Sequence, residues 1–355
     1  MAMEIGVGLD HTLGMNWDDQ ANLAREAAKL GYESIWTPEN IGTDSFQVCA
    51  RRWQASCDVV EGGLTTGIGV SPVMYRTPIG FAMSGGTLSQ QTGGKFIMGI
   101  GAGSAYRPAN RRDLGFPRVS ALNLMRDYLT TIKGLVNGER VSHQGEHINY
   151  NNIRMAIRPA PNTPVYLGTL GPEMLRLAGE IADGVCLNWC TPEQIAWSRE
   201  RIAEGAERVA RDPAEVKVVE YIRICVDDDE DVARRAFAKN CLGYPLGAAV
   251  PTERERQFGY RAHFERMGYT EELAGADAIR REGGDMDAVA DAYPSDALLA
   301  VGYYGKPDGA AAAFAKLAEG LDVALVRVIA ARPEIASTQA VMQACAPERV
   351  RAALA

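Results

Sequence analysis

The sequence predicts an α/β fold, a TIM-type (β/α)8 barrel with insertions that forms a single domain over residues 1–355. Two observations favour this fold. Short and almost wholly apolar segments alternate with helical segments along the chain, which is typical of parallel strands covered by helices. Eight such units follow one another, and eight units close as a barrel. A doubly wound open sheet is the alternative, but it would want a Gly-x-Gly-x-x-Gly turn after an early strand, which the first strand does not supply.

The first half of the chain supplies four units. Asn16 is placed to cap the first helix, in which apolar residues recur at the helical period until Gly31 ends it. Pro78 suits the first turn of a later helix. We expect strands at 5–9, 34–37, 64–70 and 96–100, and helices at 17–30, 44–59, 78–91 and 119–136.

The second half supplies four more units and two interruptions. A two-stranded excursion at 139–150 turns at 144–146, and a polar, arginine-rich segment at 229–295 has a helical pattern that indicates helix seven plus a divergent insertion. Thr191 is a plausible cap for one helix. We expect strands at 165–167, 185–187, 216–226 and 323–330, a short extended piece at 298–301, and helices at 172–181, 191–211, 307–319 and 335–354.

The composition indicates a globular protein with a small-molecule partner. A formal net charge of −8 argues against nucleic acid or an anionic membrane as partner, because phosphate binding is driven largely by clustered Lys and Arg. The N-terminus lacks the features of a signal peptide, and no apolar run approaches the roughly 20 residues that span a bilayer, so we expect a cytoplasmic protein. Seven scattered cysteines without CxxC spacing indicate reduced thiols and no zinc site.

The candidate site lies at the carboxyl ends of the strands, where barrel enzymes place their chemistry. Few of the residues there are charged, which suits a large planar ligand better than a metal or a polyphosphate. The loop before Pro172 is either an ordinary turn or an anion cradle for one phosphate, formed by free N–H groups at a helix start. His11 is the best candidate for proton transfer, and Glu39 serves either as a base or only as a capping and hydrogen-bonding group. The residues after the strands are Asp10 and His11, Glu39 and Asn40, Gly69 to Ser71, Gly101 to Ser104, Gly168 to Gly171, and Asn188.

Several of these segments together resemble the luciferase-like monooxygenase superfamily, and within it the coenzyme F420-dependent branch that includes methylenetetrahydromethanopterin reductase. The similar segments are Glu26 to Trp36, Gly67 to Pro72, Tyr75 to Pro78, Phe96 to Gly103, Gly168 to Pro172, and Ala182 to Gly184. The resemblance implies a barrel that holds a flavin or deazaflavin ring at its strand ends, a dimer, and a non-proline cis peptide in a bulge of the third strand. By the spacing to Arg76 and Pro78, that peptide is expected at Gly69–Val70.

Two positions depart from the pattern of this branch. Glu39 and Asn40 stand where F420-dependent relatives often show an Asp-His pair, and Gly103 and Ser104 stand where its sugar-phosphate dehydrogenases show Gly-Glu. The substrate of those dehydrogenases is therefore not implied for this chain.

The resemblance leads to three functional hypotheses. The first is an F420-dependent oxidoreductase that moves a hydride between the deazaflavin and a small organic substrate. The second is an FMN-dependent monooxygenase supplied with reduced flavin by a separate reductase, and the third is a non-catalytic flavin-binding protein. Proton transfer is expected from His11, Glu39 or Tyr106. Cofactor binding is expected from Asn40, Gly69, Val70, Ser71, Gly101, Ala102, Gly103, Ser104, Gly168, Thr169, Leu170, Gly171 and Asn188.

Overall fold

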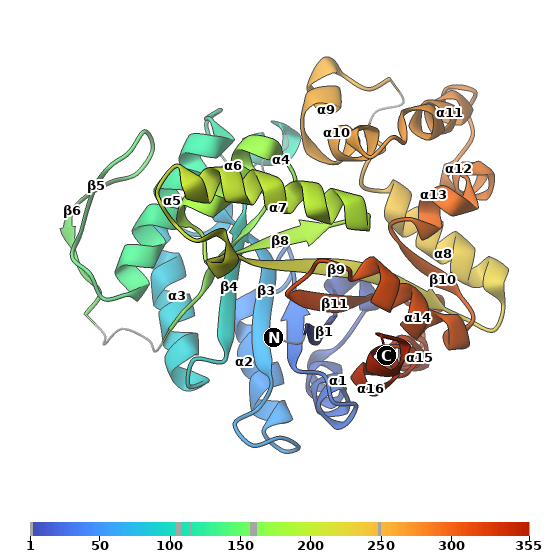
Figure 1. The fold of residues 1–355 in the computed structure, drawn as a ribbon, viewed down its shortest axis with the longest axis horizontal. Coiled ribbons are helices and arrows are strands. Elements are labelled where there is room, and N and C mark those ends of the chain that lie inside the picture. Colours follow the sequence, from blue (N-terminus) through green and yellow to red (C-terminus); the bar gives the residue numbers. More distant parts are fainter. Residues whose placement is uncertain (1–2, 104–107, 114, 157–161, 248–249, 355) are drawn as a thin grey trace.

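A closed barrel of parallel strands forms the centre of the molecule, as predicted (Figure 1). The computed structural model describes residues 3–103, 108–113, 115–156, 162–247 and 250–354. Within these residues the barrel strands are β1 (Glu4–Gly8), β2 (Ser34–Thr37), β3 (Thr65–Pro72), β4 (Phe96–Gly101), β7 (Val165–Gly168), β8 (Gly184–Asn188), β9 (Lys217–Val226) and β11 (Val323–Val328). They pair in chain order, and the ring closes because β11 pairs with β1.

Helices surround the barrel, and two of them begin at the caps that the sequence predicts. The Asn16 carboxamide oxygen accepts the N–H groups of Asp18 and Asp19 at 2.8 and 2.9 Å, and Thr191 caps its helix through the N–H of Gln194. These helices are α1 (Trp17–Lys29), α2 (Ser45–Ser56), α3 (Pro78–Gln91), α4 (Pro108–Asp113), α5 (Ala121–Val136), α6 (Pro172–Ile181), α7 (Pro192–Glu207), α14 (Pro307–Leu317), α15 (Ile335–Ala344) and α16 (Pro347–Leu354).

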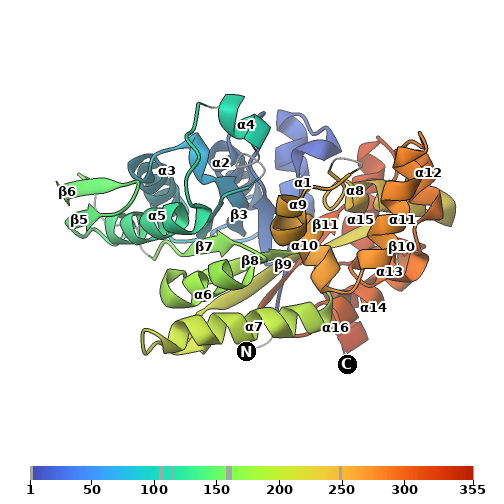
Figure 2. The ribbon, with the colours of Figure 1, turned by 90° about the horizontal axis from the view of Figure 1, so that it is seen from above.

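Two groups of elements lie outside this frame. The predicted excursion is an antiparallel hairpin of β5 (Val141–Gln144) and β6 (Asn149–Ile153), which projects to the left in Figure 1. The helices between β9 and β10 (Gly302–Gly305) gather on one side of the barrel (Figure 2). They are α8 (Glu230–Leu242), α9 (Glu253–Gln257), α10 (Gly259–Arg266), α11 (Thr270–Arg281), α12 (Met286–Ala292) and α13 (Ser295–Leu299). No helix in the part of the chain described here is long and apolar enough to cross a bilayer.

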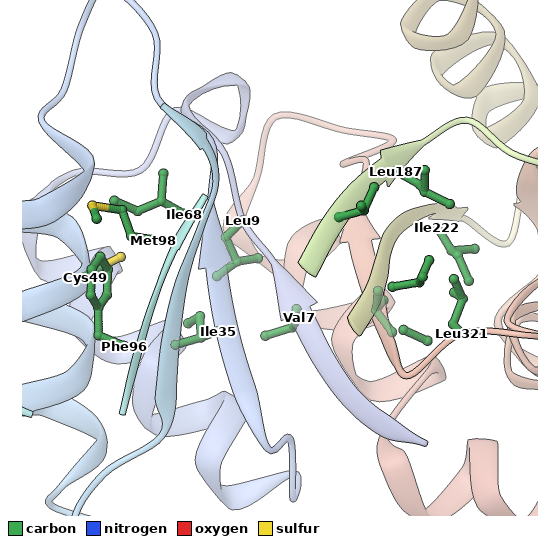
Figure 3. Close-up of a cluster of buried hydrophobic side chains, with 14 of the residues drawn as sticks. Val7, Leu9, Ile35, Cys49, Ile68, Phe96, Met98, Leu187, Ile222 and Leu321 are labelled. Atoms are coloured by element: carbon green, nitrogen blue, oxygen red, sulfur yellow. The ribbon is translucent and has the colours of Figure 1, made fainter. Parts of the chain in front are cut away.

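Buried side chains form separate layers inside and outside the barrel wall. Val7, Ile35 and Phe96 belong to the large cluster between strands and helices (Figure 3). Trp36 and Tyr221 belong to a smaller cluster drawn from several strands, which fills the barrel interior. Because side chains alternate along a strand, this second set marks the inward-facing positions. It therefore identifies the inward-facing residues of the strands that contribute to it.

Two predicted elements are wrong. The segment 298–301 is not extended: Leu298 and Leu299 end α13, and the strand begins only at Gly302. A short apolar run does not distinguish a strand from a helical turn. The predicted helix at 335–354 is two helices, because Pro347 has no N–H to continue α15 and instead begins α16.

Candidate functional site

A bulge in β3 brings backbone to the carboxyl end of the barrel. The pairing of β3 with β4 shifts register between Ile68 and Ser71, and the peptide bond between Gly69 and Val70 is cis, at the position that the resemblance implies. The bulge rests on Tyr221 from the barrel interior: a Cβ added at Gly69 would lie 2.7 Å from the Tyr221 hydroxyl. This contact explains why position 69 is a glycine.

Three glycines of the neighbouring strands make room for the bulge. A Cβ at Gly101 or at Gly168 would lie 2.8 Å from a methyl group of Val70, and one at Gly99 would lie 2.0 Å from the Ile68 carbonyl oxygen. The alternating glycines of β4 are therefore required by the bulge itself. The sequence indicated that a bulky group passes close to them, and part of that group is a side chain of the protein.

Glu39 ties the bulge to the start of α2. Its N–H donates to the carbonyl of Val70 at 3.1 Å, and its carboxylate accepts from the Ser71 hydroxyl. Arg76 donates to both carboxylate oxygens, at 2.5 and 2.7 Å, and the N–H of Ser45 donates to one of them at 3.1 Å. With both oxygens engaged and the side chain buried, the geometry favours the hydrogen-bonding role of Glu39 over that of a base.

His11 and Asn40 meet at the ends of β1 and β2. The Asn40 amide nitrogen lies 2.8 Å from Nδ1 and 2.6 Å from Nε2 of His11. Partial burial lowers the pKa of His11, which favours the neutral ring at physiological pH. Asp10 points elsewhere and pairs with the buried Arg327 of β11. Of the two polar residues that end β1, His11 is thus the one that can exchange a proton with a ligand.

The loop after β7 ends at the N-terminus of α6, which has no side-chain cap. Gly171 precedes α6 without a side-chain cap, and a Cβ built on it would meet nothing within 4 Å. Upstream, the Thr169 N–H donates to the carbonyl of Cys186 at 3.3 Å, which fixes the loop to β8. Uncapped N–H groups and the helix dipole suit a phosphate, so this loop fits the phosphate of a flavin-type cofactor.

Asn188 is held from two sides at the end of β8. Its carboxamide oxygen accepts from Arg223 of β9, and its nitrogen donates to the Tyr260 hydroxyl at 2.5 Å. Arg223 is buried and lies 4.0 Å from the centre of the Trp189 ring, while its other nitrogen donates to Tyr244 at 2.9 Å. Sequence reasoning missed these partners.

One of these partners, Arg223, could have been found from the sequence. Arg223 is a charged residue at an inward-facing position of β9, two residues after Tyr221 and with apolar residues directly before and after it. The partners from the insertion carried no such signal.

The predicted residues of the loop after β4 are described only in part. Gly101 ends β4, Ala102 is half-buried, and Gly103 turns the chain with a φ of 60°. Ser104 and Tyr106 lie outside the described residues. We call the carboxyl end of the barrel the mouth. The groups that lie around it are His11, Asn40, the bulge, the loop after β7 and Asn188. Such a set of groups fits a planar ring with a phosphate-bearing tail.

Comparisons with known proteins show what this chain is similar to. A sequence profile of the family described as luciferase-like monooxygenase matches residues 3–323. The 5,10-methylenetetrahydromethanopterin reductase of Methanolobus tindarius is 27% identical over 88% of this chain and 90% of its own length. An F420-dependent glucose-6-phosphate dehydrogenase of Nakamurella multipartita is 24% identical over 60% of this chain and 65% of its own length.

A solved structure with a similar fold comes from a protein of related name. The solved structure of the coenzyme F420-dependent tetrahydromethanopterin reductase from Methanopyrus kandleri superimposes with a TM-score of 0.76 at 23% identity, covering 98% of each chain.

Proposed function

We propose that this chain, which belongs to the luciferase-like monooxygenase family, is a coenzyme F420-dependent oxidoreductase that acts on a small organic substrate. The observation that carries the proposal is the similarity to the methylenetetrahydromethanopterin reductase, which extends over nearly the whole of both chains. The relative from Nakamurella multipartita, whose name contains F420, supports F420 as the cofactor. The substrate of that dehydrogenase is not carried over to this chain, because Gly103 and Ser104 stand where the sugar-phosphate dehydrogenases show Gly-Glu.

The residues at the mouth would hold and orient the cofactor. When bound, F420 supplies the carbon that accepts or releases the hydride. The β3 bulge with Val70 offers a rigid apolar support for a ring, and the uncapped start of α6 beside Gly171 suits the phosphate. Orientation of two reacting carbons by such rigid elements accounts for much of the catalysis in hydride transfer.

His11 is the proposed proton-transfer residue. Partial burial lowers the pKa of His11 and so favours the neutral ring, and the Asn40 amide nitrogen lies within hydrogen-bonding distance of both ring nitrogens. We expect His11→Ala to lower kcat more than it lowers the affinity for F420, because the ring moves a proton and does not hold the cofactor. Equal turnover in the variant would reject this role. Glu39 is proposed as a positioning group, and the role of Tyr106 stays a prediction.

An FMN-dependent monooxygenase is the second candidate, because monooxygenases give the family its description. The decisive experiment is a titration of the purified protein with F420 and with FMN, followed by absorbance and by the shift in Tm. We expect tight binding of F420 and oxidation of reduced F420 by at least one member of a panel of aldehydes, alcohols, enones and quinones.

Each other result selects a different function. Tight binding of FMN without binding of F420 would overturn the proposal in favour of the monooxygenase. Binding of a cofactor that is never turned over would favour a flavin-binding protein. The homodimer and the separate reductase implied by the resemblance stay predictions, and light scattering tests the first of them.

A further inference from the structure

Helix α10 of the insertion contacts the loops that follow β7 and β8. Tyr260, His263 and Arg266 are three residues apart and so lie on one side of this helix. The Tyr260 hydroxyl accepts a hydrogen bond from the Asn188 amide. The His263 ring donates to the backbone carbonyl of Trp189, and the Arg266 guanidinium donates to that of Leu170.

His263 links the two loops through both of its ring nitrogens. Nε2 lies 2.8 Å from the Trp189 carbonyl oxygen, which can only accept, so Nε2 carries the proton. Nδ1 then accepts from Arg266 at 3.1 Å, and the same Arg266 nitrogen donates to the Leu170 carbonyl at 2.7 Å. Complete burial lowers the pKa of His263 to about 3, so the ring is neutral and keeps this pattern of donors near neutral pH.

The loop after β8 has a backbone conformation that needs support. Trp189 has a φ of 59°, in the left-handed region that bulky residues rarely adopt. Such a conformation persists only where surrounding contacts hold it. The Trp189 carbonyl is held by His263, and the next N–H, of Cys190, donates to Glu220 at 2.6 Å.

We infer that His263 and Arg266 are positioning residues that hold the loops after β7 and β8 in the geometry that binds the cofactor. We call this pair with the carbonyls of Leu170 and Trp189 the clasp. The inference rests on the proposed function, because it assumes that Gly168 to Gly171 and Asn188 face F420. It gives the insertion a part in cofactor binding.

The test compares three variants for F420 affinity and for amide hydrogen exchange. His263→Leu removes both bonds of the ring, and we expect the F420 Kd to rise about tenfold, as for the loss of one or two buried hydrogen bonds. The amides of Thr169 and Cys190, which bind the two loops to Cys186 of β8 and Glu220 of β9, should exchange faster even without cofactor. His263→Gln keeps an N–H donor for the Trp189 carbonyl and should restore most of the affinity.

Arg280→Met is the matched control. Arg280 makes a similar bond of 2.8 Å to a backbone carbonyl, that of Gly247, but within the insertion. We expect this variant to keep the wild-type Kd for F420 and the wild-type exchange at Thr169 and Cys190, even where its Tm falls. A purely structural role of the clasp would make His263→Leu behave in the same way.

The outcomes separate the clasp from the cofactor. If the wild-type protein does not bind F420, the proposed function fails. The clasp is then tested only by amide hydrogen exchange at Thr169 and Cys190, which should be faster in His263→Leu than in the wild type. If it does bind, an unchanged Kd in folded His263→Leu overturns the clasp, as does unchanged exchange. Should His263→Leu not fold, Arg266→Met takes its place, because the exposed Arg266 can be replaced without opening a core.

Discussion

At the scale of single residues, Glu220 is a buried carboxyl group whose protonation affects stability. It is 1% exposed on β9, one carboxylate oxygen accepts from Cys190, and the other has no partner among the described residues. Burial raises the pKa of Glu220 to about 8 from an ordinary value of 4.5. Between these pH values the unfolded chain loses a proton that the native protein keeps, so stability falls as pH rises, by up to about 1.4 kcal/mol per pH unit.

We therefore expect Glu220→Gln to be more stable than the wild type by an amount that grows with pH between about 4.5 and about 8. Glutamine copies the neutral carboxyl group and cannot ionise. Urea unfolding at several pH values in this window measures the difference. Glu193→Gln is the control, since Glu193 is exposed and its pKa is lowered from the ordinary value, so it is ionised in both states over most of the window. A difference for Glu220→Gln that does not change with pH would contradict the expectation.

Residue positions were predictable from the sequence, but their partners were not. The rule that polar groups follow barrel strands placed His11, Glu39 and Asn188 at one edge. The partners of the last two come from far along the chain: Arg76 lies 37 residues from Glu39, and Arg223 lies 35 residues from Asn188. A local pattern contains no information about such pairs, so it could not distinguish a free carboxylate from one that is already paired.

At the scale of elements, the β3 bulge and the glycines beside it form one packed unit. We expect Gly168→Ala to destabilise the protein by about 1–3 kcal/mol, because the new methyl group overlaps Val70. Val70→Ala removes the overlapping methyl groups, so adding Gly168→Ala to it should cost less. Denaturant unfolding of the two single variants and the double variant gives this coupling free energy.

The control for this cycle is another glycine with free space around it. A Cβ at Gly275, inside α11, would meet nothing within 4 Å, so Gly275→Ala should stabilise the protein by up to about 1 kcal/mol. Additive effects of Gly168→Ala and Val70→Ala would show that the bulge is not packed against β7.

Elements with a local cause were predicted well, and those with a tertiary cause were not. Caps such as Asn16 and Thr191 marked helix starts correctly, because the capping bond joins neighbours in the chain. The strand β10 was missed, since it forms only by pairing with β9 beyond the point where β8 ends. Its four residues, which include two glycines, show no strand pattern of their own.

At the scale of the whole molecule, the insertion and the barrel share one hydrophobic cluster. Phe237, Phe264 and Leu273 of the insertion pack in the same cluster as Cys225 and other residues of the barrel. Binary patterning predicted a helical insertion at 229–295 but could not say where it packs, because helices with apolar faces fit many surfaces. The shared cluster implies that the two parts open together.

Cysteine labelling can test this coupling, because Cys241 lies in the shared cluster and Cys49 lies in the main cluster of the barrel. Phe264→Ala should cost about 3–5 kcal/mol, as is typical of a buried phenylalanine. We expect it to speed thiol labelling at both Cys241 and Cys49 by about a hundredfold or more, since labelling of buried thiols follows the population of the open state. The exposed Cys57 reacts without opening of the protein and serves as the internal reference for reagent activity.

Phe314→Ala, at a fully buried position of α14, should speed the labelling of the same two cysteines, Cys241 and Cys49. Faster labelling of Cys241 alone in Phe264→Ala would mean that the insertion opens independently, and the loops after β7 and β8 would then lose their support whenever it does.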